Sequence, residues 1–218
     1  NYNVNFVGHP LIDAIADRKQ VEEVAFRKEN NLGDKKIIAL LPGSRKQEII
    51  KMLSVMLSVV DDFKEYQFVI AGAPSQDFTF YQQFIKTDNV QFINNKTYDL
   101  LSISFAALVT SGTATLETAL FKVPQVVCYK GSAITYAIAK RIITLKFISL
   151  VNLIMDKEVV TELIQSDFNT KTLTKELTKI LDESHREKVF LAYYELEKIL
   201  GGKGASEESA RLIIEGIT

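Results

Sequence analysis

The chain has 218 residues, 47% of them hydrophobic, which is enough for one large or two small domains with a buried core. Its 26 lysines and arginines nearly balance 27 aspartates and glutamates, and the resulting net charge of -1 argues against a nucleic-acid partner bound through a global basic field. The single cysteine excludes an internal disulfide framework, and no apolar run reaches the roughly 18 residues of a membrane-spanning helix.

Short apolar runs then alternate with helix-length amphipathic segments. The runs are rich in Val and Ile and too short for independent helices, which predicts buried strands at Ile37–Leu41, Phe68–Ala71, Val90–Ile93, Ala106–Thr110 and Val123–Cys128. The segments between them have helical spacing and are Glu48–Phe63, Phe78–Ile85, Tyr98–Ser104 and Thr113–Leu120. We therefore predict an α/β fold, a Rossmann-like parallel sheet with helices on both faces and its strand-to-helix loops at the carboxyl edge.

The last third of the chain is predicted to be mostly helical. The expected helices are Ser132–Ile143, Glu158–Leu163, Thr170–Leu181, Ser184–Leu200 and Ser206–Ile217. Within this part, the stretch from Tyr136 to Ile148 mixes Lys140, Arg141 and Lys146 with apolar residues. Such a pattern fits a membrane surface or, more commonly, core packing with extended lysines.

Three of the expected carboxyl-edge loops are rich in small residues. They are Leu41–Arg45, Ala71–Ser75 and Thr110–Glu117. Small residues let a ligand approach the backbone, and the free amides at a helix N-terminus bind anions. Arg45 adds a forked contact for phosphate, and Glu117, one helical turn after Thr113, suits paired ribose hydroxyls. Together these loops predict a nucleotide site with the diphosphate at the helix start and the ribose on the acid.

Each of these features also has a commoner explanation. Ser-Gly-Thr before a helix is usually a cap, and Arg45 or Glu117 alone is more often a solvated surface charge. Their joint occurrence at one sheet edge favours the nucleotide site. The chain has neither a Walker A motif nor a Gly-x-Gly-x-x-Gly fingerprint, and His9 and His185 form no metal-spaced cluster, so we expect no metal.

Two further polar residues have an open role. Asn152 is the lone polar residue of an apolar run, just before an expected helix, and Gln165 follows that helix. A buried asparagine needs hydrogen-bond partners. A ligand role and a local turn role are about equally compatible with either position.

Six motifs occur in an order that resembles one enzyme family. They are FVGHPLID (6–13), LLPGSRKQEI (40–49), TSGTATLETAL (110–120), PQVVCYK (124–130), SLVNLIMDKEVVTELIQ (149–165) and ASEESARLI (205–213). The ordered set resembles the lipid-A-disaccharide synthases, bacterial glycosyltransferases of family 19 with the GT-B fold, over essentially the whole chain.

The resemblance implies an inverting hexosyltransferase of lipid A biosynthesis. Such an enzyme moves 2,3-diacylglucosamine from its UDP derivative onto 2,3-diacylglucosamine 1-phosphate and forms a β-1,6-linked disaccharide. The resemblance also implies a cytoplasmic protein, peripheral at the inner membrane of a Gram-negative bacterium, with no cofactor other than the UDP-sugar donor and with a homodimer as one option.

Carried over position by position, the family's donor site gives Arg45 and Asn152 catalytic roles. The full binding set falls on Gly43, Ser44, Arg45, Ser111, Gly112, Thr113, Ala114, Glu117, Asn152 and Gln165.

The family's GT-B fold has two Rossmann-like halves, and this chain matches the second, UDP-binding half. Residues 1–20, which include His9, are expected to cross between the halves, 21–183 to form the UDP-sugar-binding domain, and 184–218 to form C-terminal helices. The carboxylate base belongs to the other half, so the chain alone is expected to be inactive. Two alternatives remain open: another GT-B enzyme, such as a UDP-N-acetylglucosamine 2-epimerase, and a non-catalytic nucleotide-binding module.

Overall fold

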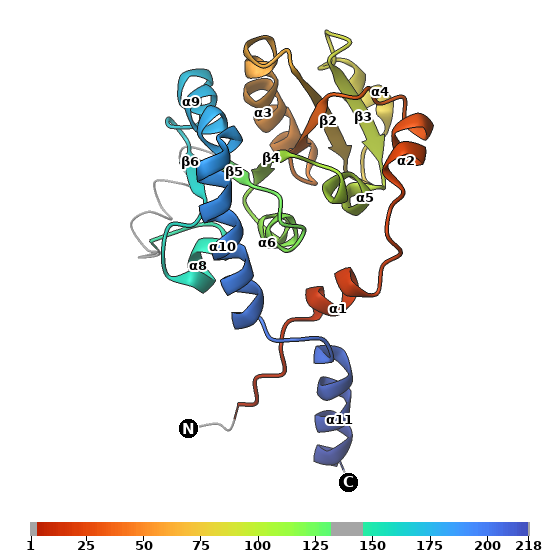
Figure 1. Cartoon of the computed structure of the whole chain (residues 1–218), viewed down its shortest axis with the longest axis vertical. Helices are drawn as coiled ribbons and strands as arrows, with labels where there is room; N and C mark the ends of the chain where they lie inside the picture. Colours follow the sequence, from red (N-terminus) through yellow and green to blue (C-terminus); the bar gives the residue numbers. More distant parts are fainter. Residues whose placement is uncertain (1–3, 132–145, 218) are drawn as a thin grey trace.

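A six-stranded parallel sheet forms the centre of the computed structural model, which describes residues 4–131 and 146–217 (Figure 1). Its strands lie in the order β3-β2-β1-β4-β5-β6, and every neighbouring pair is parallel. The strands are β1 (Lys36–Leu41), β2 (Tyr66–Gly72), β3 (Val90–Asn94), β4 (Ala106–Thr110), β5 (Gln125–Tyr129) and β6 (Thr161–Ile164). The first five coincide with the predicted apolar runs to within a few residues, which confirms the α/β prediction.

The sixth strand corrects the prediction of a helix at Glu158–Leu163. Residues Thr161–Ile164 pair in parallel with Val126–Tyr129 of β5, so the segment extends the sheet. The helical interpretation failed because an apolar run this short has no decisive periodicity. Pairing with the edge of β5 gives the backbone groups of both strands hydrogen-bond partners, and this tertiary contact decides the conformation.

Helices surround the sheet and mostly match the predicted segments. The expected helix Glu48–Phe63 is divided into α3 (Lys46–Met56) and the 3₁₀ helix η1 (Leu57–Asp62). The expected helix Ser132–Ile143 and most of the basic stretch after Tyr136 lie outside the described residues. The remaining helices are α1 (Pro10–Ala16), α2 (Glu23–Glu29), α4 (Phe78–Gln82), α5 (Thr97–Ser102), α6 (Thr113–Leu120), α8 (Leu150–Met155), α9 (Thr170–Leu181), α10 (Glu183–Ile199) and α11 (Ala205–Ile217).

Both faces of the sheet are buried, as expected for a parallel sheet. Along β1, Ile38 and Leu40 point into a core shared with α3 and α9, whereas Ile37 and Ala39 point into a second core shared with α2 and α5. A third cluster joins α1, α6, α8 and α10 around Val127 of β5. The alternation follows from the two-residue period of a strand and fixes its register.

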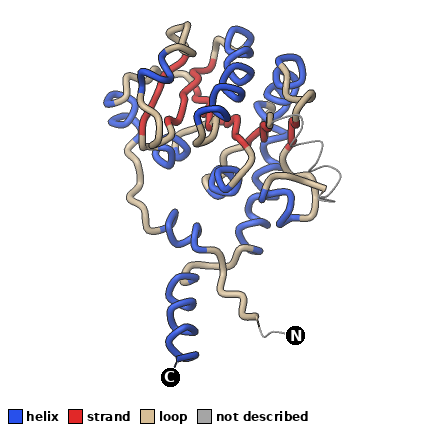
Figure 2. The backbone as a smooth tube through the Cα atoms, turned by 180° about the vertical axis from the view of Figure 1, so that it is seen from behind, coloured by secondary structure: helices blue, strands red, loops and turns tan. Residues whose placement is uncertain are grey.

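The N-terminal segment and the stretch before α11 cross beyond the sheet, after which that segment and α11 diverge (Figure 2). The Asp13 carboxylate of α1 accepts hydrogen bonds from the amides of Gly204 (2.7 Å) and Ser206 (3.0 Å), which lowers the pKa of Asp13. Asp13 therefore holds the start of α11. Among the described residues, no helix combines the length and apolar character needed to cross a membrane.

Candidate functional site

The site lies where the strand order reverses. From β1 the chain continues to β2 and β3 on one side and then returns to place β4 on the other side of β1. The loops after β1 and β4 therefore diverge and leave a crevice at the carboxyl edge, the usual ligand site of such sheets. A cavity of about 370 Å³ lies there, which is large enough for a small ligand.

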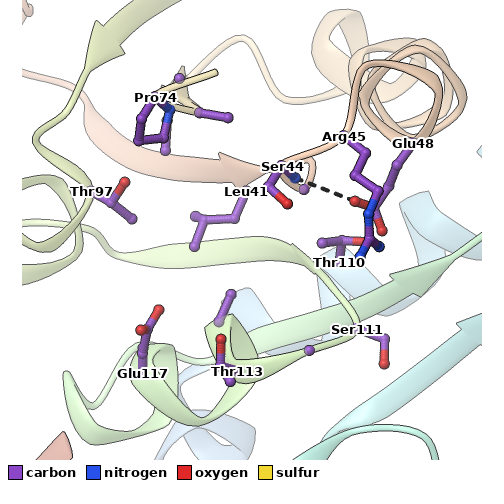
Figure 3. Close-up of a pocket in the computed structure, with 16 residues that line it drawn as sticks. Leu41, Ser44, Arg45, Glu48, Pro74, Thr97, Thr110, Ser111, Thr113 and Glu117 are labelled. Atoms are coloured by element: carbon purple, nitrogen blue, oxygen red, sulfur yellow. Dashed lines mark hydrogen bonds between the residues drawn. The ribbon is translucent and has the colours of Figure 1, made fainter. Parts of the chain in front are cut away.

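The cavity brings together eight of the ten predicted binding residues (Figure 3). They come from the loop after β1 and from the loop and helix after β4. These residues are Gly43, Ser44, Arg45, Ser111, Gly112, Thr113, Ala114 and Glu117.

The loop after β1 requires its glycine. Gly43 has φ +106°, and a β-carbon there would collide with the side chain of Glu48. Glu48 lines the cavity and accepts a hydrogen bond from the amide of Ser44 at 3.3 Å (Figure 3). Arg45 follows as an exposed residue at the N-cap of α3, where its guanidinium is available to an anion in the cavity.

The loop after β4 presents helix amides to the cavity. Gly112, with φ +148°, is the N-cap of α6 and supplies no capping side chain, and nothing lies within 4 Å of where its β-carbon would be. The first amides of α6, those of Thr113 and Ala114, therefore lie open at the positive end of the helix. This arrangement can bind an anion.

Glu117 lies one turn further along α6, on the wall of the same cavity. Its Oε1 accepts a hydrogen bond from the hydroxyl of Tyr98 at 2.8 Å. The spacing that the sequence predicted between the helix start and the acid is therefore present in the structure.

Thr110 is a cavity residue that the predicted set does not contain. It ends β4, is 6% exposed, and its hydroxyl has no hydrogen-bond partner among the residues that the structure describes. An unpaired buried hydroxyl is uncommon and marks a position where a ligand can supply the partner. Its place at the carboxyl end of a strand is the sequence signal that could have identified it. Glu48 and Thr97 also line the cavity without having been predicted.

Asn152 does not line the cavity, and its expected binding and catalytic roles stay a prediction. It is fully buried in α8, and its amide nitrogen donates to Val160 O (2.8 Å) and Glu162 Oε1 (2.9 Å). Its oxygen accepts from the amides of Val159 (2.8 Å) and Val160 (3.0 Å). Both hydrogens and both lone pairs of the side chain are used, so it has no capacity left for a ligand.

The hydrogen-bond network around Asn152 nevertheless holds a segment that contacts the cavity residue Ser111. Glu162 accepts hydrogen bonds from the amides of Ile148 (2.8 Å) and Ser149 (2.9 Å). The carbonyl of Ile148 in turn accepts one from the hydroxyl of Ser111 at 2.8 Å. The buried network therefore anchors the segment that holds the loop after β4.

Gln165 also lies apart from the cavity residues. It follows β6 with φ +54°, and its backbone amide donates to the carbonyl oxygen of Tyr129 at 2.8 Å. Its side-chain nitrogen is buried without a partner in the described part of the chain.

Within residues 4–131 and 146–217, no group of three or more His, Cys, Asp or Glu side chains could hold a metal ion.

Comparison with known proteins identifies relatives over nearly the whole chain. The family model described as lipid-A-disaccharide synthetase matches residues 1–213. The lipid-A-disaccharide synthase of Syntrophus aciditrophicus is 38% identical over 216 residues, covering 95% of this chain and 56% of the relative. That of Coxiella burnetii (strain CbuG_Q212) is 33% identical, covering 98% of this chain and 57% of the relative. The chain thus spans little more than half the length of these curated relatives.

Solved structures show the same fold at low sequence identity. The Neisseria meningitidis UDP-GlcNAc 2-epimerase bound to UDP-GlcNAc has a TM-score of 0.63 at 16% identity, covering 96% of this chain and 54% of the epimerase. The S. aureus MnaA-UDP structure has a TM-score of 0.62 at 15% identity, covering 95% and 53%. These likenesses confirm the Rossmann-like half of a GT-B fold.

We expect Asn152→Ala to destabilise the chain by roughly 2–4 kcal/mol, because it leaves several buried hydrogen-bonding groups unpaired. Asn94→Ala, which alters an exposed asparagine at the end of β3, should change stability by less than about 0.5 kcal/mol. Urea unfolding followed by circular dichroism measures both. Equal unfolding midpoints for the two variants would contradict the structural role of Asn152.

Proposed function

The chain belongs to the lipid-A-disaccharide synthase family, and we propose that it provides the part of such a glycosyltransferase that binds the UDP moiety of the sugar donor. One observation carries the proposal. The open amino terminus of α6, Arg45 and Glu117 surround a single cavity (Figure 3). Two of these groups suit a diphosphate, and the third suits a ribose.

In the proposed complex, the diphosphate lies against the first amides of α6, at Thr113 and Ala114, with Arg45 supplying a charge-assisted contact. The glycines at 43 and 112 let the ligand approach the backbone. The ribose hydroxyls donate to Glu117, which is one helical turn, about 5.4 Å, along the axis from the helix start. The unpaired hydroxyl of Thr110 at the end of β4 is available to the same ligand.

We propose that the reaction transfers 2,3-diacylglucosamine from UDP to the 6-hydroxyl of 2,3-diacylglucosamine 1-phosphate with inversion. Negative charge develops on the departing UDP as the glycosidic bond breaks. Donors that are already oriented toward that charge stabilise the transition state more than the bound substrate. The amides of α6 and Arg45 perform this role without a divalent metal.

The remaining parts of the proposal concern the chain's place in the whole enzyme. Residues 21–183 form the donor domain, 1–20 cross to the other half, and 184–218 are its C-terminal helices. The base that deprotonates the acceptor belongs to the part of the relatives that this chain does not match. Because both substrates carry acyl chains, we propose that the enzyme works at a membrane surface as a peripheral protein. The proposed surface is the cytoplasmic face of the inner membrane, where the enzyme acts alone or as a homodimer.

The epimerases found by structural comparison give the main competing function. Their similarity, at 15–16% identity, shows a shared fold, whereas the family membership of this chain rests on sequence matches of 31–38%. The transferase is therefore the better-supported function. Turnover of unacylated UDP-N-acetylglucosamine, with acylated UDP-sugars unused, would favour the epimerase.

The chain should bind UDP in the absence of divalent metal, because its phosphate contacts are amides and an arginine. Isothermal titration calorimetry in EDTA measures this, with a parallel titration in magnesium. Strict dependence on magnesium or manganese would refute the metal-independent site.

Arg45→Ala should weaken UDP binding by about 10- to 100-fold while barely affecting uridine, because the lost contact is to phosphate. Glu117→Ala should weaken both ligands, since both contain the ribose. Arg211→Ala, on α11 outside the cavity, is the matched control and should leave UDP binding unchanged. Equal losses of UDP and uridine in the Arg45 variant would contradict the assignment.

The chain alone should show no transferase activity. Positioning of acceptor and donor across a cleft contributes about 7–11 kcal/mol to catalysis, more than any single contact in this site. A radiolabelled acyl-sugar acceptor assay would compare the chain, the chain mixed with the unmatched part of the Syntrophus aciditrophicus relative, and that relative complete. We expect turnover from the complete relative and restoration in the mixture. If the chain alone turned over at a rate near that of the complete enzyme, the proposal that the base lies outside this chain would be wrong.

A further inference from the structure

One oxygen of the Glu117 carboxylate accepts a hydrogen bond from a residue of another helix. The Tyr98 hydroxyl, at the start of α5, donates to Glu117 Oε1 at 2.8 Å. Among the described residues, no hydrogen bond reaches the second carboxylate oxygen, Oε2. The Glu117 side chain rises from α6 into the cavity (Figure 3). One oxygen is therefore held by the protein, and the other is available to a ligand.

The ring of Tyr98 is itself held on two sides. Phe121 packs against it with a centroid distance of 5.3 Å. The guanidinium of Arg18 lies 5.3 Å from the Tyr98 ring centroid and 5.6 Å from that of Phe121, and it forms an ion pair with Asp99. Cation–π contacts and aromatic packing favour one ring position. The direction of the hydroxyl toward Glu117 is therefore fixed by its surroundings.

The protonation state of Tyr98 suits this contact. Burial of its hydroxyl, together with the neighbouring Glu117 carboxylate, raises the pKa of Tyr98 above its ordinary value. The hydroxyl thus keeps its proton at neutral pH and is the donor. A hydrogen bond to a carboxylate is stronger than one between neutral groups, so it restrains the Glu117 side chain more firmly.

We propose that Tyr98 is a positioning residue, which fixes one oxygen of Glu117 so that the other is preoriented for the ribose hydroxyls of the nucleotide. This inference rests on the proposed UDP site and adds to it a residue from helix α5. A free glutamate side chain samples several rotamers, and ordering it on binding costs conformational entropy. The Tyr98 hydrogen bond restrains the side chain before the ligand arrives, so less of that cost falls on binding.

The experiment compares ligands with and without ribose hydroxyls. Calorimetry measures UDP and 2′,3′-dideoxy-UDP binding to the parent chain, Tyr98→Phe, Glu117→Ala and the double variant. Tyr98→Phe keeps the packed ring and removes only the hydroxyl. It should weaken UDP by roughly 3- to 10-fold and leave dideoxy-UDP unchanged. In the Glu117→Ala background it should cause no further loss, because the two residues act through one contact.

Matched controls separate positioning from folding. Tyr194→Phe removes a hydroxyl from an exposed tyrosine on α10, outside the cavity, and should bind both ligands like the parent chain. Thermal unfolding of each variant reports its stability. A fold defect would weaken both ligands together, whereas a positioning defect is confined to the ligand that carries the hydroxyls.

The outcomes distinguish this inference from the function on which it rests. Equal loss of both ligands in Tyr98→Phe, or no loss of either, overturns the positioning role while leaving the UDP site intact. Equal binding of UDP and dideoxy-UDP by the parent chain overturns the ribose assignment of Glu117, and the role of Tyr98 with it. Absence of UDP binding by the parent chain overturns the proposed function itself.

Discussion

Strands β1 and β4 lie side by side although the chain passes through β2 and β3 between them. Leu41 pairs with Val109, so the two strands end at nearly the same level, and their following loops diverge at the same edge. The eight predicted binding residues that meet in the cavity all come from the segments after these two strands. A shift of β1 relative to β4 would separate Arg45 from the start of α6. The register of this pair, buried on both faces, therefore sets the distance between the candidate phosphate-binding groups.

The elements that could be predicted from sequence are those whose signal is local. The five longer strands show apolar runs, and the Gly43 and Gly112 loops show small residues between a strand and a helix. The sixth strand could not be predicted, because four residues carry no usable period and its conformation depends on β5. Asn152 could not be placed either. Its sequence neighbours mark it as buried and polar, but the groups that satisfy its amide lie seven to ten residues away across a turn.

The two helix N-termini at the cavity are not equivalent, a difference that the sequence did not reveal. At α3, the carboxylate of Glu48 accepts from the amide of Ser44, the residue before the N-cap, and places negative charge near that end. At α6, Gly112 is the N-cap and contributes no side chain. An incoming anion therefore meets less competition at α6 than at α3. In this arrangement α6 supplies the amides, and α3 contributes chiefly the guanidinium of Arg45.

The proposed ligand-facing groups lie on the loops after β1 and β4 and on α6, but the residues that support them come from elsewhere in the chain. The hydroxyl of Ser111 donates to the Ile148 carbonyl, and the amide of Ile148 donates to Glu162, which also accepts from Asn152. Glu117 accepts from the hydroxyl of Tyr98. A site stabilises developing charge only if its donors stay in place when the charge appears, so such supports are part of the chemistry. Asn152 has a supporting role of this kind, because it holds Glu162, which in turn holds the segment that is hydrogen-bonded to the loop after β4.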